Sequence, residues 1–244
     1  MKKFLAIAIA VLMLLSLSAC AKKTETKTPG TTADSGAETK GVFRVGMECN
    51  YAPFNWTQTS ANDRTVPITS GGYADGYDVQ IAKLIADGLG KKLEIVKIEW
   101  DGLTLAVDSG DIDAIIAGMS PTEKRKLTID FTDNYYNSEL VVVVKKDGPY
   151  AKATKLADFS GAKITGQLNT FHYSVIDQIQ GVKKQTALET FPAMIVALNS
   201  GAVDGYISEK PGALAALRPL VRVPLAVGEQ FGDRWDVHEL IERH

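Results

Sequence analysis

A nine-residue pattern occurs twice in this chain and constrains its fold more than any other feature. Residues 105–113 read LAVDSGDID and residues 196–204 read VALNSGAVD, with a constant offset of 91 residues. In both copies an apolar helical stretch ends at a glycine, the residue that most readily closes a helix in the left-handed conformation. A short apolar run follows each glycine and has the character of a strand. Two copies of a helix–glycine–strand unit predict two similar α/β lobes.

The rest of the chain alternates between helix and strand signals. A helix is expected at residues 76–89, because apolar residues recur at Ile81, Leu84, Ile85 and Leu89 and place Gln80, Lys83 and Asp87 on the outer face. Residues 141–144 are an unbroken β-branched run, typical of a strand buried on both faces. Residues 55–72 are polar and predict a loop. The other expected strands are 42–46, 93–98, 112–117, 163–165 and 203–209, and the other expected helices are 103–109 and 192–200.

Residues 118–125 indicate a receptor for a carboxylate. Ser120 and Glu123 have the spacing of a helix capping box, and Pro121 suits the first helical position. A strand would then lead into a helix whose first N–H groups are unpaired, and such a helix start binds anions. Arg125 lies in the first turn, where its guanidinium can bind a carboxylate through two hydrogen bonds. The alternative is an ordinary surface helix with Arg125 in solvent.

The N-terminus has the pattern of a bacterial lipoprotein signal. Two lysines precede an apolar stretch, residues 4–17, that is short for a membrane span and typical of a secretion signal. It ends in LSAC, which resembles a lipobox with Cys20 as the lipidated residue. An ordinary signal peptide that happens to be cleaved near Cys20 is the alternative. Residues 1–20 are therefore interpreted as a lipoprotein signal and residues 21–41 as a disordered tether, because the tether lacks large apolar side chains.

Composition narrows the function classes. The 244 residues are 45% hydrophobic, enough for one large core or two small ones. The formal net charge of −2 gives no indication of nucleic-acid binding. The two cysteines, Cys20 and Cys49, lack metal-site spacing. We expect no metal or cofactor, and we expect Cys49 to be a free thiol without a role.

Residues 110–136 carry a longer pattern that resembles a known family. It is similar to the middle of a family-3 extracellular solute-binding protein, the receptor of a polar amino-acid ABC importer, and further similarities cover residues 42–216. The matching residues are Gly110, Asp113, Thr122, Glu123, Arg125, Asp130, Phe131, Thr132, Tyr135 and Tyr136. The resemblance implies an α/β, two-lobe periplasmic-binding-protein-like (type II) fold. Lobe 1 would be residues 42–138 and lobe 2 residues 139–216.

The resemblance also implies the ligand contacts. The ligand carboxylate would be bound by Arg125 and Ser120 from lobe 1 and by Thr170 from lobe 2. In the family an acid at the end of the second repeat's strand pairs with the ligand ammonium; here it is Glu209 in place of the usual Asp. The remaining implied contacts are Glu48 at the polar end of the ligand, Tyr51 and Trp100 against its body, and Gly118.

Each of these residues also has a plainer interpretation. Tyr51, with Phe54, can simply pack between lobes, Trp100 can be a core anchor, and Glu209 can be a solvated loop acid. Asn169 stands where the family usually has Gly, which leaves the shape of the loop before Thr170 open. His172 is interpreted as a partly exposed helix residue without a function.

Residues 217–244 do not continue the resemblance. They contain no lysine, and residues 223–231 resemble a barrel strand of the enolase-superfamily sugar-acid dehydratases, in which Glu229 would be a Mg²⁺ ligand. A lone carboxylate does not hold Mg²⁺. We interpret this tail as a fusion or assembly artefact, with a divergent C-terminus as the alternative. In either case the C-terminal return of the chain to lobe 1 is expected to be missing.

The leading functional hypothesis is a monomeric, lipid-anchored receptor on the outer face of the bacterial cytoplasmic membrane. It would capture a free polar amino acid between two closing lobes and present it to the membrane subunits of an ABC importer. Two alternatives stay open at this point. One is a cyclohexadienyl-dehydratase-like enzyme that uses Glu48 or Glu209 as an acid, and the other is a sensor lipoprotein without a transport role. Glu48 and Glu209 favour a cationic ligand.

Overall fold

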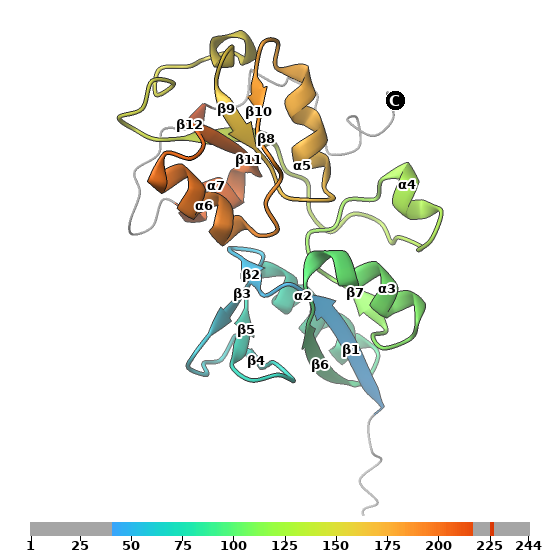
Figure 1. Ribbon diagram of the computed structural model, residues 1–244. Helices are drawn as coiled ribbons and strands as arrows, with labels where there is room; N and C mark the ends of the chain where they lie inside the picture. The colour runs from blue at the N-terminus through green and yellow to red at the C-terminus, as the bar shows by residue number, and fades with distance from the viewer. Residues whose placement is uncertain (1–40, 217–224, 227–244) are drawn as a thin grey trace, which may run out of the picture. The chain divides into compact units, whose positions relative to one another are not determined.

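The computed structural model describes residues 41–216 and 225–226 of the chain, and Figure 1 shows its elements. Two sheets take all their strands from residues 42–115, and a third takes its strands from residues 140–226. The predicted signal sequence, the lipobox at Cys20 and most of the tether lie outside the described residues. So does the tail, apart from Leu225 and Ala226. No helix within the described residues has the length and apolar character needed to cross a membrane.

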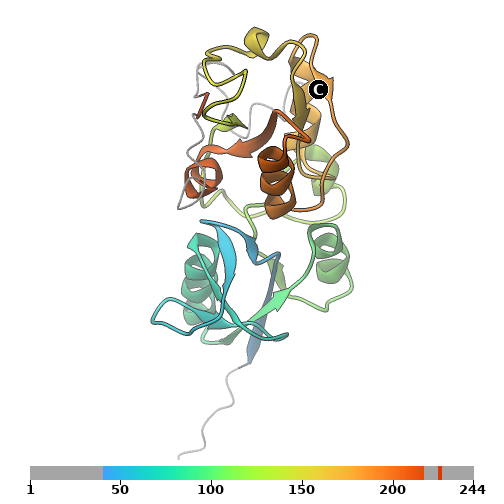
Figure 2. The same cartoon turned by 60° about the vertical axis from the view of Figure 1, so that its left-hand side comes forward.

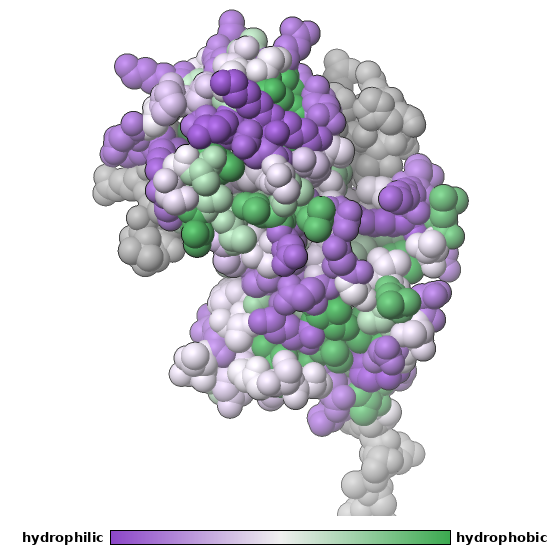
Figure 3. Space-filling view, in the orientation of Figure 1, coloured by the Kyte–Doolittle hydropathy of each residue, from purple (hydrophilic) through white to green (hydrophobic). Residues whose placement is uncertain are grey.

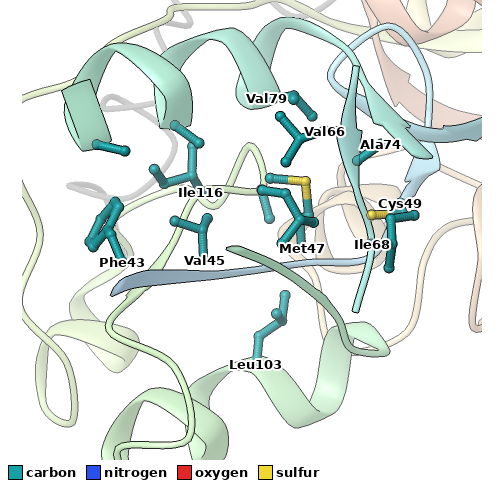
Figure 4. Close-up of a cluster of buried hydrophobic side chains, with 14 residues drawn as sticks. Phe43, Val45, Met47, Cys49, Val66, Ile68, Ala74, Val79, Leu103 and Ile116 are labelled. Carbon is teal, nitrogen blue, oxygen red and sulfur yellow. The ribbon is translucent and has the colours of Figure 1, made fainter. Parts of the chain in front are cut away.

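The first sheet is parallel and has the order β6-β1-β7. Its strands are β1 (Val42–Met47), β6 (Lys92–Lys97) and β7 (Ala114–Ile115). Helix α2 (Tyr77–Gly88) follows the second sheet in the chain, and α3 (Leu103–Asp108) follows the 3-10 turn η1 (Trp100–Gly102). Figure 4 shows the core of this half, with Val45 and Met47 of β1 facing Val79 of α2 and Leu103 on the other side of the strand.

The second sheet is antiparallel and was not predicted. It has the order β2-β3-β5-β4, with β2 (Asn50–Tyr51), β3 (Asn55–Gln58), β4 (Val66–Pro67) and β5 (Tyr73–Asp75). The prediction of a loop over residues 55–72 is therefore wrong at both ends. Strands of two to four residues are too short to show an alternation of apolar and polar side chains, so no period-2 signal was available.

The third sheet is mixed and has the order β10-β9-β11-β8-β12. It contains β8 (Leu140–Val144), β9 (Lys163–Thr165), β10 (Lys183–Lys184), β11 (Gly205–Glu209) and β12 (Leu225–Ala226). All five residues of β8 are buried, and they alternate between two separate hydrophobic clusters. The prediction that this run is buried on both faces is confirmed.

Helices cover both faces of this third sheet, as Figures 1 and 2 show. One face packs against α6 (Phe191–Ser200) and α7 (Lys210–Ala216). The other packs against η2 (Leu156–Phe159), α5 (Phe171–Ser174) and η3 (Val175–Gln178).

The repeat seen in the sequence is also a structural repeat. Gly110 closes the first copy with φ 79° and Gly201 closes the second with φ 81°. In each copy the residue two positions after the glycine donates its N–H to the carbonyl six residues earlier: Ile112 to Ala106 at 3.2 Å, and Val203 to Ala197 at 3.3 Å. The prediction of one unit used twice is confirmed.

The aspartate that ends each copy repeats as well. The Asp113 carboxylate accepts the backbone N–H of Arg44 at 2.7 Å, and the Asp204 carboxylate accepts that of Lys163 at 2.8 Å. Each aspartate therefore joins its copy to a neighbouring parallel strand, β1 in the first case and β9 in the second.

The buried face of α2 differs from the predicted one. Val79, Ala82 and Ala86 face the core, whereas Leu84 is 68% exposed and Leu89 is 55% exposed. The small alanines allow close approach to the sheet. The prediction was based on large apolar residues and therefore did not include them.

On the face of the molecule shown in Figure 3, hydrophobic residues are interspersed among hydrophilic ones. Cys49 is a buried free thiol, as expected.

Candidate functional site

Most of the residues predicted to bind ligand follow the carboxyl ends of parallel strands. Glu48 comes directly after β1, Trp100 three residues after β6, and Thr170 five residues after β9. Gly118 and Ser120 follow β7, and Glu209 is the last residue of β11. Ligands of open α/β sheets bind at this edge, because the loops after neighbouring parallel strands meet there.

Arg125 lies in a single helical turn, α4 (Glu123–Lys126). The predicted start of this helix is wrong: Thr122 is the N-cap, its Oγ1 accepts the N–H of Arg125 at 3.2 Å, and Ser120 and Pro121 precede the helix. Ser120 stands three residues before Glu123 just as Thr122 stands three residues before Arg125, so spacing alone does not decide between the two candidate caps.

The Arg125 side chain reaches the loop after β9. Its guanidinium donates to the carbonyl of Ser120 at 3.0 Å and to that of Asn169 at 3.4 Å, and lies 5.0 Å from the Trp100 ring centroid. Within the described residues no carboxylate lies within ion-pair distance of it. Burial lowers its pKa to about 10, so it remains a cation at neutral pH. Arg125 is a partly buried positive charge without a carboxylate partner in the part of the chain that the structure describes.

Glu48 is a buried acid that also contacts the loop after β9. Its Oε1 accepts a hydrogen bond from Gln167 Nε2 at 2.9 Å. Burial raises the pKa of the Glu48 carboxyl to about 7, the Gln167 bond opposes that shift, and the nearby charges of Glu99 and Asp101 add to it. The surroundings of Glu48 are acidic and suit a cation.

Glu209 is a second buried acid, and it touches residues from two other elements. Its carboxyl accepts the Tyr51 hydroxyl proton, and its Oε1 lies 2.8 Å from His172 Nε2. Burial raises the pKa of Glu209 to about 8. The interpretation of Glu209 as a solvated loop acid is therefore wrong, because only 5% of the residue is exposed.

His172 is buried beside Glu209, contrary to the prediction that it is partly exposed. It is 5% exposed, and its Nδ1 lies 3.2 Å from Thr170 Oγ1. The Thr170 hydroxyl donates a hydrogen bond to the Gln167 carbonyl at 2.7 Å, which assigns His172 Nδ1 as the donor to Thr170. Nε2 of a neutral ring then carries no proton; it lies 2.8 Å from Glu209 Oε1 but has no hydrogen-bond partner among the described residues, and its closeness favours the protonated form of that carboxyl. Burial and the positive charge of Arg125 lower the pKa of His172 to about 3, which favours this neutral pair.

The loop before Thr170 has the shape that a glycine would give it. Asn169 adopts φ 55°, a left-handed conformation that asparagine tolerates better than most residues. The substitution of Asn for the family's usual Gly therefore leaves the loop conformation intact.

The two predicted aromatic contacts differ in their surroundings. Tyr51 is buried and stacks on Phe191, with ring centroids 4.0 Å apart, and it joins the cluster that contains α6. Trp100 is half-buried, packs against the first core, and donates its Nε1–H to the Asn169 carbonyl at 3.4 Å. Trp100 thus serves the core and also borders the loop after β9. Phe54 is buried in the Tyr51 cluster, in line with a packing role.

Gly118 and Ser120 border a cavity of about 570 Å³. Tyr51 and Glu209 also line it, but most of its wall is formed by residues 113–121 and 128–138. The cavity includes only part of the candidate site. We therefore define the site by the contacts among its residues and not by the cavity. Among residues 41–216, no three His, Cys, Asp or Glu side chains converge as a metal site.

Two site residues were missed in the sequence. His172 has no local signal because it is a single histidine in a helix, and Gln167 lies in the loop before Thr170 and was not singled out. A spacing signal did exist, because both lie within three residues of Thr170. The sequence did not show that both residues are buried, or that His172 contacts Glu209 and Gln167 contacts Glu48. These partners are distant in the chain.

Comparison with known proteins agrees with this fold. Residues 43–170 match the family described as bacterial extracellular solute-binding proteins, family 3. The probable histidine-binding protein of Campylobacter jejuni is 30% identical over 213 residues, which cover 87% of this chain and 76% of the relative. The arginine-binding extracellular protein ArtP of Bacillus subtilis is 30% identical over 140 residues, covering 57% of this chain and 49% of ArtP. The chain thus spans three quarters of the first relative and half of the second.

Solved structures show the same fold. The substrate-binding protein of an amino acid ABC transporter superposes with a TM-score of 0.69 at 30% identity, covering 80% of this chain and 82% of the other. The ancestral amino-acid-binding protein AncCDT-1, a precursor of cyclohexadienyl dehydratase, superposes with a TM-score of 0.64 at 28% identity, covering 75% of this chain and 76% of the other. The fold is the predicted two-lobe, type II α/β fold. The chain belongs to the bacterial extracellular solute-binding proteins, family 3.

Proposed function

We propose that this protein is the receptor of an ABC importer and that it captures a free polar amino acid. The observation that carries the proposal is the position of Arg125, a cation without an anion among the described residues. Arg125 donates to Asn169 in the loop after β9, the buried acid Glu48 accepts a hydrogen bond from Gln167 of that loop, and the buried acid Glu209 lies beside His172, which follows the loop. A free α-amino acid carries a carboxylate and an ammonium group, and complements such a set of charges.

Each predicted contact has a role in this proposal. The ligand carboxylate would lie on Arg125, Ser120 and Thr170, and its ammonium on Glu209. Tyr51, Trp100 and Gly118 would enclose the body of the ligand. His172 and Gln167 are placed to orient Glu209, Thr170 and Glu48 rather than to touch the ligand.

The acids favour a cationic amino acid within the polar class. Glu48 has Glu99 and Asp101 near enough to affect its pKa, so this end of the site is negative as a whole. The two relatives named above are described as histidine- and arginine-binding, which supports the same choice.

Binding is expected to couple to closure of the two lobes, proposed as residues 42–138 and 139–216. Arg125 and Glu48 come from the first range, and Thr170 and Glu209 come from the second. A ligand that contacts both sets stabilises the arrangement in which both are near it.

The first test is a thermal melt of residues 21–244 with each of the twenty amino acids, followed by calorimetry on any amino acid that raises the melting temperature. Arg125→Ala is expected to abolish binding and leave the melt of the empty protein cooperative. Lys124→Ala is the matched control, because Lys124 is exposed on the same helical turn. Wild-type affinity in Arg125→Ala would disprove the assignment.

An enzymatic function is the second candidate, favoured by the burial of Glu48 and Glu209 and by the likeness to AncCDT-1. A cyclohexadienyl dehydratase needs an acid that protonates a leaving hydroxyl group. The relatives are described as binding proteins, and we propose that this chain is one too. Turnover of prephenate or arogenate by the purified protein would reverse that choice.

The lipid anchor belongs to the same proposal. Cys20 would be lipidated and would hold a monomeric receptor at the outer face of the cytoplasmic membrane. Cys20→Ala is expected to move the protein from the membrane fraction to the soluble fraction, and an unchanged distribution would exclude the anchor. Uptake of labelled amino acid in cells with and without the protein separates a transport role from a sensor role.

A further inference from the structure

We infer that Asp78 is a positioning residue for the candidate site, because through Asn55 and Tyr135 it connects the two loops that carry Glu48 and Gly118. Asp78 contacts neither loop directly and lies outside the predicted ligand contacts. The inference rests on the proposed function, since it concerns how the amino-acid site is held in shape.

One oxygen of Asp78 leads to the loop after β1. Asp78 Oδ2 accepts a hydrogen bond from Asn55 Nδ2 at 2.7 Å, and Asn55 Oδ1 accepts the backbone N–H of Cys49 at 2.8 Å. Cys49 has φ 55°, a conformation that is unfavourable for a residue with a side chain. Thr57 holds the Cys49 carbonyl at 2.8 Å. These two bonds hold Cys49 in the turn that places Glu48.

The other oxygen leads to the loop after β7. Asp78 Oδ1 accepts the Tyr135 hydroxyl proton at 2.8 Å, and the same hydroxyl accepts the N–H of Gly118 at 3.0 Å. Gly118 has φ 60° and is followed by Ser120, a predicted contact of the ligand carboxylate. The N–H of Gly118 is thus hydrogen-bonded to Tyr135, and Tyr135 connects the loop after β7 to Asp78 of α2.

The start of α2 brings Asp78 into this position. Asp78 is 0% exposed and Asn55 is 1% exposed, so neither group can exchange its partner for bulk water. The Asp78 N–H donates to the Phe54 carbonyl at 2.8 Å, next to Asn55. Gly76 permits this approach, because a Cβ there would lie 2.2 Å from the Phe54 carbonyl oxygen. Burial raises the pKa of Asp78 to about 6, and both hydrogen bonds oppose that shift.

This geometry makes one side chain responsible for the spacing of two ligand-facing loops. The contacts it supports join residues of the first half of the chain only, so they do not depend on contacts with the second half. A site whose loops are already placed loses less conformational freedom on binding and binds more tightly.

The test measures the dissociation constant of the amino acid found in the melts, by calorimetry, for four variants. Tyr135→Phe removes the hydroxyl and keeps the ring. Asp78→Asn replaces one of the two acceptor oxygens by an NH₂, which either faces the NH₂ of Asn55 or leaves the Tyr135 hydroxyl proton without its acceptor. The reciprocal pair Asn55→Asp with Asp78→Asn restores a donor opposite an acceptor at every bond. Tyr150→Phe is the matched control, because Tyr150 is a partly buried tyrosine in the second core cluster.

Tyr135→Phe is expected to weaken binding about tenfold, the effect of losing one well-placed hydrogen bond. Hydrogen exchange at the Gly118 amide, followed by nuclear magnetic resonance, should become faster in the same variant. Asp78→Asn should also bind more weakly, and the reciprocal pair should recover most of the loss. Tyr150→Phe should match wild type in both measurements.

Several outcomes would overturn the inference. Wild-type affinity in Tyr135→Phe would do so, as would Gly118 exchange at the wild-type rate. If Asp78→Asn does not fold, the affinity and the Gly118 exchange rate of Tyr135→Phe alone test the inference. A wild-type protein that binds none of the twenty amino acids overturns the proposed function, and this inference with it. A wild type that binds while Tyr135→Phe binds equally well overturns only this inference.

Discussion

The carboxyl group of Glu209 has surroundings that favour its uncharged form in the empty protein. The carboxyl is buried, which disfavours its charge, and no cation lies within ion-pair distance among the described residues apart from the His172 ring, whose Nε2 lies 2.8 Å away. The hydrogen bond that Tyr51 donates to it opposes this preference. The folded-state pKa of about 8 is higher than the usual value of 4.5. The folded protein therefore binds a proton here over a pH range in which the unfolded chain has lost it. An ammonium ligand would replace that proton.

We predict that this proton makes the empty protein less stable as pH rises. A raised carboxyl pKa contributes stability that is complete below the unfolded pKa and is lost as pH rises through the folded pKa. Glu209→Gln cannot lose a proton, so its free energy of unfolding relative to wild type should rise between about pH 4.5 and about pH 8. The gain should be on the order of a few kcal/mol.

Chemical denaturation at several pH values measures this difference. Glu139→Gln is the control, because Glu139 is an exposed acid paired with Lys210, the residue after Glu209. A parallel pair of stability curves for wild type and Glu209→Gln would mean that Glu209 is ionised in both states, and the neutral pair with His172 would be wrong.

At the scale of elements, the two copies of the helix–glycine–strand unit follow the same rules in separate parts of the chain. A glycine in the left-handed region follows each helix, and an aspartate directly before each strand accepts the N–H of a neighbouring strand. A left-handed position costs a residue with a side chain roughly 1–2 kcal/mol. The two glycines are therefore required by backbone shape.

We predict equal costs for Gly110→Ala and Gly201→Ala. Each should lower the free energy of unfolding by about 1–2 kcal/mol. Gly88→Ala is the control: Gly88 is the last residue of α2, its φ is not positive, and a Cβ there meets nothing within 4 Å. That change should be neutral or stabilising by about 0.5 kcal/mol. A cost confined to one of the two repeat glycines would show that the copies are not equivalent in their folding energetics.

The sequence predicted those elements whose signals are local. The repeat, the buried strand β8 and the helix that ends at Gly201 all follow from runs, periods or punctuating glycines. The four short strands β2–β5 were missed because two to four residues cannot show an alternation of apolar and polar side chains. The burial of His172 was missed because it depends on residues distant in the chain, such as Glu209. The buried face of α2 was predicted incorrectly because its alanines, and not its leucines, pack against the core. That choice depends on the neighbouring sheet and is not visible in the sequence of the helix alone.

At the scale of the whole molecule, the candidate site draws residues from both halves of the chain. Glu48 bonds to Gln167, Tyr51 to Glu209, and Arg125 to the Asn169 carbonyl. In each pair one residue precedes position 138 and the other follows it. Neither half alone contains both a charge for the ligand carboxylate and an acid for its ammonium in the proposed arrangement. Binding should therefore be a property of the complete chain.

We predict that ligand slows backbone hydrogen exchange in four separate segments, residues 46–52, 116–126, 165–173 and 205–210. These segments carry the proposed contacts, and a ligand that binds only the native site reduces local opening wherever it touches. Hydrogen exchange with mass spectrometry, at saturating amino acid, measures all four together. Residues 84–90, at the C-terminal end of α2 and just beyond it, carry none of the proposed contacts, so they are the internal control and should not change. Arg125→Ala should lose all four effects at once, because a ligand without its carboxylate partner would not stay bound. Protection confined to segments before residue 138, or to those after it, would show that one half binds the ligand alone, and the shared site would then be wrong.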